Sequence, residues 1–295
     1  LEREWTFADL GTLVDALARE MQAHGVVEGD RVLIVAENCP EHVALILACS
    51  RIGAWSCGVN ARMSRGEIRA FIAKADPRLV YFTAGVSDVA AGHAQDAAAV
   101  PSVVAGLSRS PVRTQALAEP APLAQQVAAV IFTSGTTGTP KGIVQSHGMR
   151  WTHINRGGVY GYGPEGTTLL ATPLYSNTTL VVFFPTLGSG GCVVLMPKFD
   201  AARYLQLAQQ HRVTHTMLVP VQYQRLMACP DFDRADLRLL QHKFCTSAPF
   251  SATLKAEVLQ RWPGRLIEYY GMTEGGVRCE LHCHDHPNKL HTVGR

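Results

Sequence analysis

One stretch of the chain, Thr133-Ser-Gly-Thr-Thr-Gly-Thr-Pro-Lys-Gly142, combines three glycines, several hydroxyl side chains and a single lysine. It follows the apolar run Ala128–Phe132, which is typical of a buried strand. The glycines, Gly142 included, let the backbone turn tightly and expose its N–H groups. Backbone N–H groups, hydroxyls and the cation of Lys141 together suit a polyphosphate. The stretch therefore predicts a phosphate-binding loop.

The spacing of this loop differs from that of the P-loop, G-x-x-x-x-G-K-[ST]. Counting back from Lys141 places Gly135 at the first glycine, but Pro140 stands at the second. Gly142 stands where the P-loop has the hydroxyl that binds Mg²⁺. A flexible linker would need neither the buried strand before it nor the lysine. We therefore expect a phosphate loop of another kind.

Two further segments join this loop in a family resemblance. Thr133–Gly142 and Tyr270-Gly-Met-Thr-Glu274 resemble signature segments of the adenylate-forming superfamily, which includes acyl-CoA and aryl-CoA synthetases, luciferases and the adenylation domains of peptide synthetases. Lys243–Pro249 is similar to a small-residue segment that lies against the adenine in that family, with Ser247 in place of glycine. Small residues let a flat purine approach the backbone closely, although an ordinary turn is the alternative. The resemblance covers nearly the whole chain.

The resemblance implies a role for individual residues. Lys141 and the loop hydroxyls would face the β- and γ-phosphates, Thr273 the α-phosphate, and Glu274 would bind Mg²⁺. Tyr270 would stack on or flank the adenine. The implied catalytic residues are Lys141, Thr273 and Glu274, with Glu274 as the metal ligand, and the implied nucleotide-binding residues are Thr133, Ser134, Gly135, Thr136, Thr137, Gly138, Ser247, Ala248, Pro249, Glu268, Tyr269, Tyr270, Gly271 and Met272.

The reaction that the resemblance implies has two steps. A carboxylate attacks the α-phosphorus of ATP, which releases pyrophosphate and leaves an acyl-adenylate. The thiol of CoA then attacks the acyl carbon, because AMP is a stable leaving group. Loading of a carrier protein, and a weakly catalytic nucleotide-binding module, remain alternatives. ATP or AMP, Mg²⁺ and CoA are therefore the expected cofactors and co-substrates.

The substrate is expected to be a fatty or aromatic acid. Pro173–Thr178 matches a family segment that often borders the acyl pocket, with Ser176 in place of a histidine. Relatives that activate amino acids carry an acid there to hold the ammonium group, and this chain has none. The apolar run Leu180–Phe184 is either a buried helix or a pocket lining. His147, a few residues beyond the lysine, is either structural or a ligand contact.

Composition narrows the class of protein. A net charge of +3 over 295 residues gives no reason to expect a nucleic-acid partner. No apolar run approaches the roughly 20 residues that span a bilayer. Eight scattered cysteines fit buried thiols in a reducing cytoplasm. In the tail Cys279–His286, the cysteines and histidines that could bind a metal ion alternate along the chain, a spacing that favours a loop or edge strand over a zinc site. A homodimer is compatible with the resemblance.

Alternating strand and helix patterns predict an α/β fold with mostly parallel sheets. We expect two packed αβα subdomains, one of about residues 31–160 and one of about 1–30 plus 161–295. Both ends of the sequence resemble the interior of longer relatives. The C-terminal lid domain of the family, which carries a lysine needed for adenylation, is therefore expected to be missing. Weak nucleotide binding and poor turnover would follow.

Helix caps and breakers locate several elements. Thr6 and Ser64 begin capping boxes, Pro40 and Pro220 suit first helical turns, and Asp200 suits an N-cap. The pattern weakens over residues 84–127, where we expect one short strand and loops. Directly after the phosphate loop, from about Gln145, we expect a helix.

Overall fold

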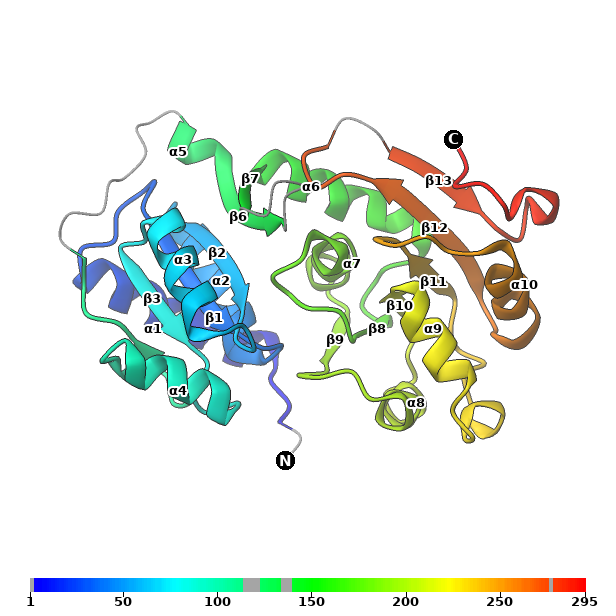
Figure 1. The fold of residues 1–295 in the computed structure, drawn as a ribbon, viewed down its shortest axis with the longest axis horizontal. Helices are drawn as coiled ribbons and strands as arrows, with labels where there is room; N and C mark the ends of the chain where they lie inside the picture. Colours follow the sequence, from blue (N-terminus) through cyan, green and yellow to red (C-terminus); the bar gives the residue numbers. More distant parts are fainter. Residues whose placement is uncertain (1–2, 114–122, 134–139, 276–277) are drawn as a thin grey trace. The chain divides into compact units, whose positions relative to one another are not determined.

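The computed structural model describes residues 3–113, 123–133, 140–275 and 278–295 (Figure 1). The chain divides into two compact units, Leu1–Met149 with Leu174–Ser176, and Arg150–Pro173 with Asn177–Arg295. Each unit contains one mixed, mostly parallel sheet, so the predicted α/β class is confirmed. The predicted placement of residues 1–30 in the second unit is wrong. That segment belongs to the first unit, where its helix packs on the helix formed by Pro40–Arg51.

The sheet of the first unit has the order β4-β5-β3-β1-β2-β6-β7. Its four central strands are parallel, whereas β5 pairs antiparallel with β3, and β7 antiparallel with β6. The central strands β1 and β3 are mostly apolar and almost fully buried, as expected for a sheet covered on both faces. The strands are β1 (Arg31–Ala36), β2 (Trp55–Asn60), β3 (Leu79–Phe82), β4 (Val100–Pro101), β5 (Ser108–Arg109), β6 (Val127–Thr133) and β7 (Lys141–Ser146).

The helices of the first unit begin where the sequence places their caps. Thr6 and Ser64 each accept a hydrogen bond from the backbone of the third helical residue, and that residue's carboxylate accepts one in return. Two helices of this unit, α4 and the short α5, are absent from the sequence prediction; α4 follows Ser87, whose side chain caps it. The helices are α1 (Phe7–Ala23), α2 (Pro40–Arg51), α3 (Arg65–Ala75), α4 (Asp88–Asp96) and α5 (Leu123–Gln126).

A buried carboxylate ties α1 to the rest of the first unit. Glu20 accepts hydrogen bonds from the Tyr81 hydroxyl at 2.9 Å and the Ser102 hydroxyl at 2.6 Å. Arg109 supplies a positive charge, with its Nε 3.3 Å from a Glu20 oxygen. Because every partner lies on another element, this one residue links α1 to β3, β5 and the loop between β4 and β5.

The sheet of the second unit has the order β13-β12-β11-β10-β8-β9, parallel throughout except for the edge strand β13. The edge-strand alternative for the tail after Cys279 is therefore confirmed. The strands are β8 (Thr167–Leu170), β9 (Cys192–Leu195), β10 (His215–Leu218), β11 (His242–Cys245), β12 (Arg265–Gly271) and β13 (Arg278–His282).

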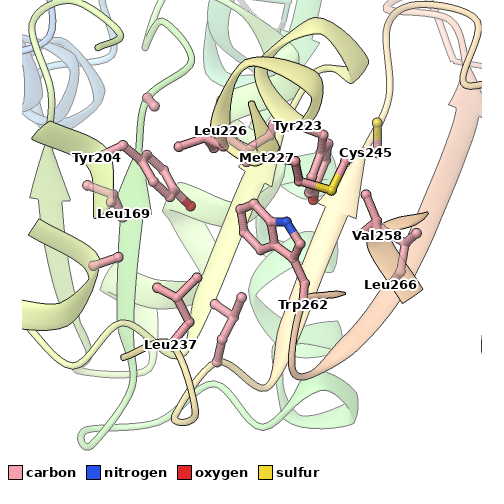
Figure 2. Packing of buried hydrophobic residues seen from close by; sticks show 14 of the residues in the cluster. Leu169, Tyr204, Tyr223, Leu226, Met227, Leu237, Cys245, Val258, Trp262 and Leu266 are labelled. Carbon is pink, nitrogen blue, oxygen red and sulfur yellow. The ribbon is translucent and has the colours of Figure 1, made fainter. Parts of the chain in front are cut away.

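A hydrophobic core lies against this sheet (Figure 2). Tyr223, Leu226 and Trp262 are at most 3% exposed, and the rings of Tyr223 and Trp262 meet edge to face at 5.4 Å. Burying one such side chain contributes about 1.5–3 kcal/mol. The helices are α6 (His147–Arg156), which begins in the first unit, α7 (Asn177–Gly188), α8 (Ala201–Gln210), α9 (Pro220–Met227) and α10 (Ala252–Arg261), with 3₁₀ turns at Gly157–Tyr160, Phe232–Arg234 and Pro287–Lys289.

Among the described residues, the helices are all too short or too polar to cross a membrane.

Candidate functional site

The predicted phosphate loop lies between two antiparallel strands of the first unit. Thr133, at the end of β6, is paired with Lys141, at the start of β7. Lys141 is exposed. The helix expected directly after the loop is therefore displaced: the chain first forms the strand Lys141–Ser146, and α6 begins at His147. Ser134, Gly135, Thr136, Thr137 and Gly138 lie outside the described residues.

The sequence predicts that Gly142 lets the backbone turn, and this prediction is wrong. Gly142 lies within β7, opposite Phe132, and not in a turn. A Cβ atom added at Gly142 would lie 2.9 Å from Cγ1 of Val130. Glycine is needed here because a neighbouring strand's side chain occupies the space, which is a packing requirement.

Two predicted segments meet at one edge of the second sheet. Strands β11 and β12 are adjacent and parallel, with Cys245 beside Glu268 in the register. Ser247–Pro249 follows the carboxyl end of β11, and Gly271–Glu274 lies at the carboxyl end of β12. In open α/β sheets, ligands bind at the carboxyl ends of the strands. The second unit therefore brings these two segments together at the edge where a ligand is expected.

Ser247 adopts a backbone conformation that favours glycine. Its φ is +76°, in the left-handed region, which costs a residue with a Cβ atom of the order of 1 kcal/mol or more. Its exposed hydroxyl forms a 2.6 Å hydrogen bond with the hydroxyl of Thr178. This bond connects the segment after β11 to the first turn of α7. Ala248 and Pro249 beside it are exposed as well.

The two tyrosines at the end of β12 have different surroundings. Tyr269 is stacked on Phe244 at 5.5 Å, and the guanidinium of Arg278 lies 4.9 Å from its ring centre. Burial raises the pKa of Tyr269 far above its usual range. Tyr270 is 53% exposed and Met272 is 55% exposed. Side chains alternate along a strand, so Tyr270 is the tyrosine whose ring is accessible to a base.

Glu268 has a buried partner of its own. Its Oε2 lies 2.5 Å from Nζ of Lys255, and both side chains are almost fully buried. Burial raises the pKa of Glu268, and the charge of Lys255 opposes that rise. The same Nζ donates to the carbonyls of Leu290 and Thr292, each at 2.8 Å. The ammonium of Lys255 thus holds β12, α10 and the segment after β13 together.

Thr273 and Glu274 occupy the tip of a tight turn. The N–H of Gly275 donates to the carbonyl of Met272 at 3.1 Å, which places Thr273 and Glu274 at its two central positions. Gly275 has a φ of +84°. Thr273 is half-buried and Glu274 is exposed. A single exposed carboxylate fits Mg²⁺, which usually takes its remaining ligands from phosphates and water.

The segment expected to border the acyl pocket divides between the units. Leu174–Ser176 belongs to the first unit, where the N–H of Leu174 donates to Oδ1 of Asn38 at 2.8 Å. Tyr175 packs so closely on β2 that a Cβ atom at Gly58 would lie 2.8 Å from its own Cβ. Asn177 begins α7 in the second unit, and Leu180–Phe184 forms part of that helix. The buried-helix alternative for this run is confirmed.

Comparison with known proteins identifies the family. The model of the family described as "AMP-binding enzyme" matches residues 1–295. A feruloyl-CoA synthase from an Amycolatopsis species is 32% identical over 277 residues, which cover 91% of this chain and 54% of that protein. An indoleacetate–CoA ligase from Aromatoleum aromaticum is 32% identical over 294 residues, covering 92% of this chain and 56% of that protein.

A solved structure agrees with these relatives in fold. The amide bond synthetase from Marinactinospora thermotolerans superposes with a TM-score of 0.81 at 28% identity, over 99% of this chain and 60% of that one. The chain thus spans little more than half the length of the curated relatives that it matches. With the family model matching the chain from end to end, this protein belongs to the AMP-binding enzymes.

Proposed function

We propose that this chain forms the nucleotide- and acid-binding part of an acid–thiol ligase. The ligase would join a carboxylic acid to AMP with release of pyrophosphate and then transfer the acyl group to CoA. The observation that carries the proposal is the shared edge of the second sheet, where Ser247–Pro249 and Gly271–Glu274 follow adjacent parallel strands. The relatives named as CoA ligases support the same reaction.

Each part of the reaction then has a candidate group. The ring of Tyr270 is accessible for stacking on adenine, next to the backbone of Ser247–Pro249. Thr273 would donate its hydroxyl to the α-phosphate, and Glu274 would hold Mg²⁺, which offsets the charge of the phosphates. Lys141, with Thr133 and the loop hydroxyls, would bind the β- and γ-phosphates. Glu268 and Tyr269 would act by packing, since their side chains are occupied within the protein.

For the acid, we propose an aromatic or other apolar carboxylic acid. The first turn of α7 offers Asn177 and Thr178 and no carboxylate that could hold an ammonium group. The two CoA ligases named above act, by their names, on feruloyl and indoleacetyl groups. A second candidate, favoured by the likeness to an amide bond synthetase, differs only in the acceptor, because an amine would replace the thiol in the second step.

Substitutions at Lys141 and Thr273 distinguish the two ends of the bound nucleotide. Lys141→Ala is expected to weaken ATP binding roughly tenfold or more, because a charged hydrogen bond contributes about 1.5–3 kcal/mol. AMP binding should stay within about twofold, since AMP lacks the phosphates that Lys141 would contact. Thr273→Ala should weaken both nucleotides. Isothermal titration calorimetry of the three proteins with ATP and AMP, in the presence of Mg²⁺, measures these differences.

Two results would contradict the proposal. Equal losses of ATP and AMP affinity in Lys141→Ala would show that Lys141 does not contact the β- and γ-phosphates. Nucleotide binding unaffected by either substitution would place the nucleotide elsewhere. The acceptor is decided by mass spectrometry of the products formed from ATP, an aryl acid and either CoA or an amine. A thioester supports the ligase, and an amide alone supports the second candidate.

A further inference from the structure

A buried arginine on α6 has only part of its guanidinium satisfied. Arg150 is 5% exposed. Its Nη1 donates a 2.8 Å hydrogen bond to Oδ1 of Asn177, and its guanidinium carbon lies 5.3 Å from the ring centre of Phe184. Both partners belong to α7. The two contacts fix the position of the guanidinium against that helix.

The other edge of the same guanidinium has no acceptor. In the part of the chain that the structure describes, neither Nε nor Nη2 of Arg150 has a hydrogen-bond partner, although both atoms are buried. Burial lowers the pKa of Arg150 to about 10, so it remains charged at neutral pH. A buried charge without a counter-charge is strongly unfavourable. Nε and Nη2 together form the planar edge that matches the two oxygens of a carboxylate.

The neighbouring histidine, His153, does not offset the positive charge of Arg150. His153 lies one turn further along α6, and its Nδ1 is also buried without a partner among the described residues. Burial lowers the pKa of His153 to about 4, and the nearby Arg150, Arg278 and Arg156 lower it further in the same direction. His153 is therefore neutral at pH 7. Among the described residues, the Nε–Nη2 edge of Arg150 is therefore left without a negatively charged partner.

The position of Arg150 links it to the nucleotide side of the second unit. Asn177, which it contacts, is followed by Thr178, whose hydroxyl binds that of Ser247 at 2.6 Å. The first turn of α7 therefore lies between Arg150 and the segment proposed to face the adenine. An acid that reacts with a nucleotide must lie beside it, and the unpartnered edge of Arg150 is within the same unit.

We propose that the Nε–Nη2 edge of Arg150 is the subsite for a carboxylate of the acid substrate. This inference rests on the proposed function. The carboxylate has two sources, the reacting group itself or a second carboxylate of a dicarboxylic acid. In both cases Arg150 is a binding and specificity-determining residue, held in place by Asn177 and Phe184.

The test is a titration of benzoate, terephthalate and the uncharged benzamide into the chain saturated with AMP. Arg150→Gln and Arg150→Lys are compared with Arg156→Gln, which removes the same charge from an exposed position on the same helix. We expect both Arg150 variants to lose roughly tenfold or more in carboxylate affinity, because lysine lacks the planar edge. Benzamide binding and the Arg156→Gln variant should be unchanged.

Each outcome bears on the proposal. Losses for benzoate and terephthalate alike assign the reacting carboxylate to Arg150, whereas a loss for terephthalate alone assigns the second carboxylate. Unchanged acid affinity in the variants overturns the subsite, as does a wild-type chain that binds no carboxylate. A loss of AMP affinity with normal acid binding also overturns it, because the anion would then be a phosphate.

The melting temperature distinguishes a substrate-binding role of Arg150 from a role in stabilising the fold. Arg150→Gln removes a buried charge, so its melting temperature should equal or exceed that of the wild type. If that variant does not fold, Arg150→Lys keeps the charge and still tests the edge. Failure of the proposed function is recognised separately, by the absence of AMP binding while acid binding still depends on Arg150.

Discussion

At the scale of single residues, some buried polar side chains have several partners within the fold, whereas two residues near the proposed site have an unfavourable feature that a ligand could offset. Glu20 and Lys255 each bind several partners on different elements. Ser247 and Arg150 differ from them. Ser247 keeps a conformation that costs energy, and Arg150 keeps a buried charge half-satisfied. Departures of this kind concentrate at sites where ligands bind, because the ligand supplies what the fold omits.

His42 gives a prediction about pH. It is fully buried, and burial lowers its pKa to about 4, although a hydrogen bond with the carbonyl of Glu37 opposes that shift. Between pH 6.5 and 4 the unfolded chain binds a proton at His42 and the folded chain does not. Stability is therefore lost as the pH falls through this window, by up to about 3 kcal/mol from this residue.

The measurement is the free energy of unfolding in urea at pH 7, 5.5 and 4.5, for the wild type and His42→Gln. Glutamine keeps a donor for the Glu37 carbonyl and does not titrate. The slope of the unfolding free energy against pH reports how many more protons the unfolded chain binds than the folded chain. We expect this number to be smaller in the variant by up to one. His153 and His242, whose pKa values burial also lowers to about 4, keep part of the slope in both proteins. Identical slopes would show that His42 does not contribute.

The sequence could not reveal Arg150 or Lys255. A basic residue within a helical pattern is normally solvated, and nothing in the neighbouring residues marks these two as buried. Their roles depend on contacts with residues far away in the chain, Asn177 for Arg150 and Glu268 for Lys255. The sequence predicts a nucleotide-binding role for Glu268 and Tyr269 because they adjoin a recognisable segment, whereas only the packing shows which side chains are accessible.

At the scale of elements, local signals predicted most of the fold. Capping boxes at Thr6 and Ser64 and the proline at position 40 each begin a helix as expected. Helix α4 was missed because its buried face is made of alanines and His93, which give a weak hydrophobic pattern. Strand β7 was missed because five of its six residues are at least partly exposed and it carries little apolar alternation.

The pairing of β6 with β7 predicts a specific coupling. Gly142→Ala should destabilise the protein by about 1–3 kcal/mol, since its Cβ would lie 2.9 Å from Cγ1 of Val130. In the Val130→Ala background, which removes that methyl group, the same change should cost much less. Unfolding in urea of both single variants and the double variant gives the coupling, expected at about 1 kcal/mol. Additive effects would show that the two residues do not compete for space.

At the scale of the whole molecule, the two units have separate cores and separate buried ion pairs. The first unit ends at Met149, where the prediction placed its end at about residue 160, and it also contains residues 1–30, which the prediction placed in the second unit. An N-terminal helix carries no signal for which of two sheets it will cover. The choice follows from tertiary contacts such as those of Glu20, which the sequence does not show.

This separation predicts additivity. Lys255→Met leaves Glu268 buried without its partner in the second unit, and should cost about 3–5 kcal/mol. Glu20→Gln weakens the network in the first unit, with an expected cost of about 1–3 kcal/mol. Because the two sites share no partner, the double variant should lose the sum of the two costs, to within about 0.5 kcal/mol in urea unfolding. A coupling above about 1 kcal/mol would show that the two sites interact energetically, although they share no partner.

Because strand β7 follows the phosphate loop directly, ATP affinity at the proposed site should depend on ionic strength. In a P-loop a helix begins at the phosphates, and its dipole adds to the attraction. Here β7 comes first, and its six residues place the start of α6 about 20 Å further along the chain. A helix dipole acts only within its first turn, so the proposed phosphate site would depend on Lys141, an exposed lysine. Salt screens exposed charges over about 8 Å at physiological concentration, so a site built in this way would hold ATP less tightly as salt is added.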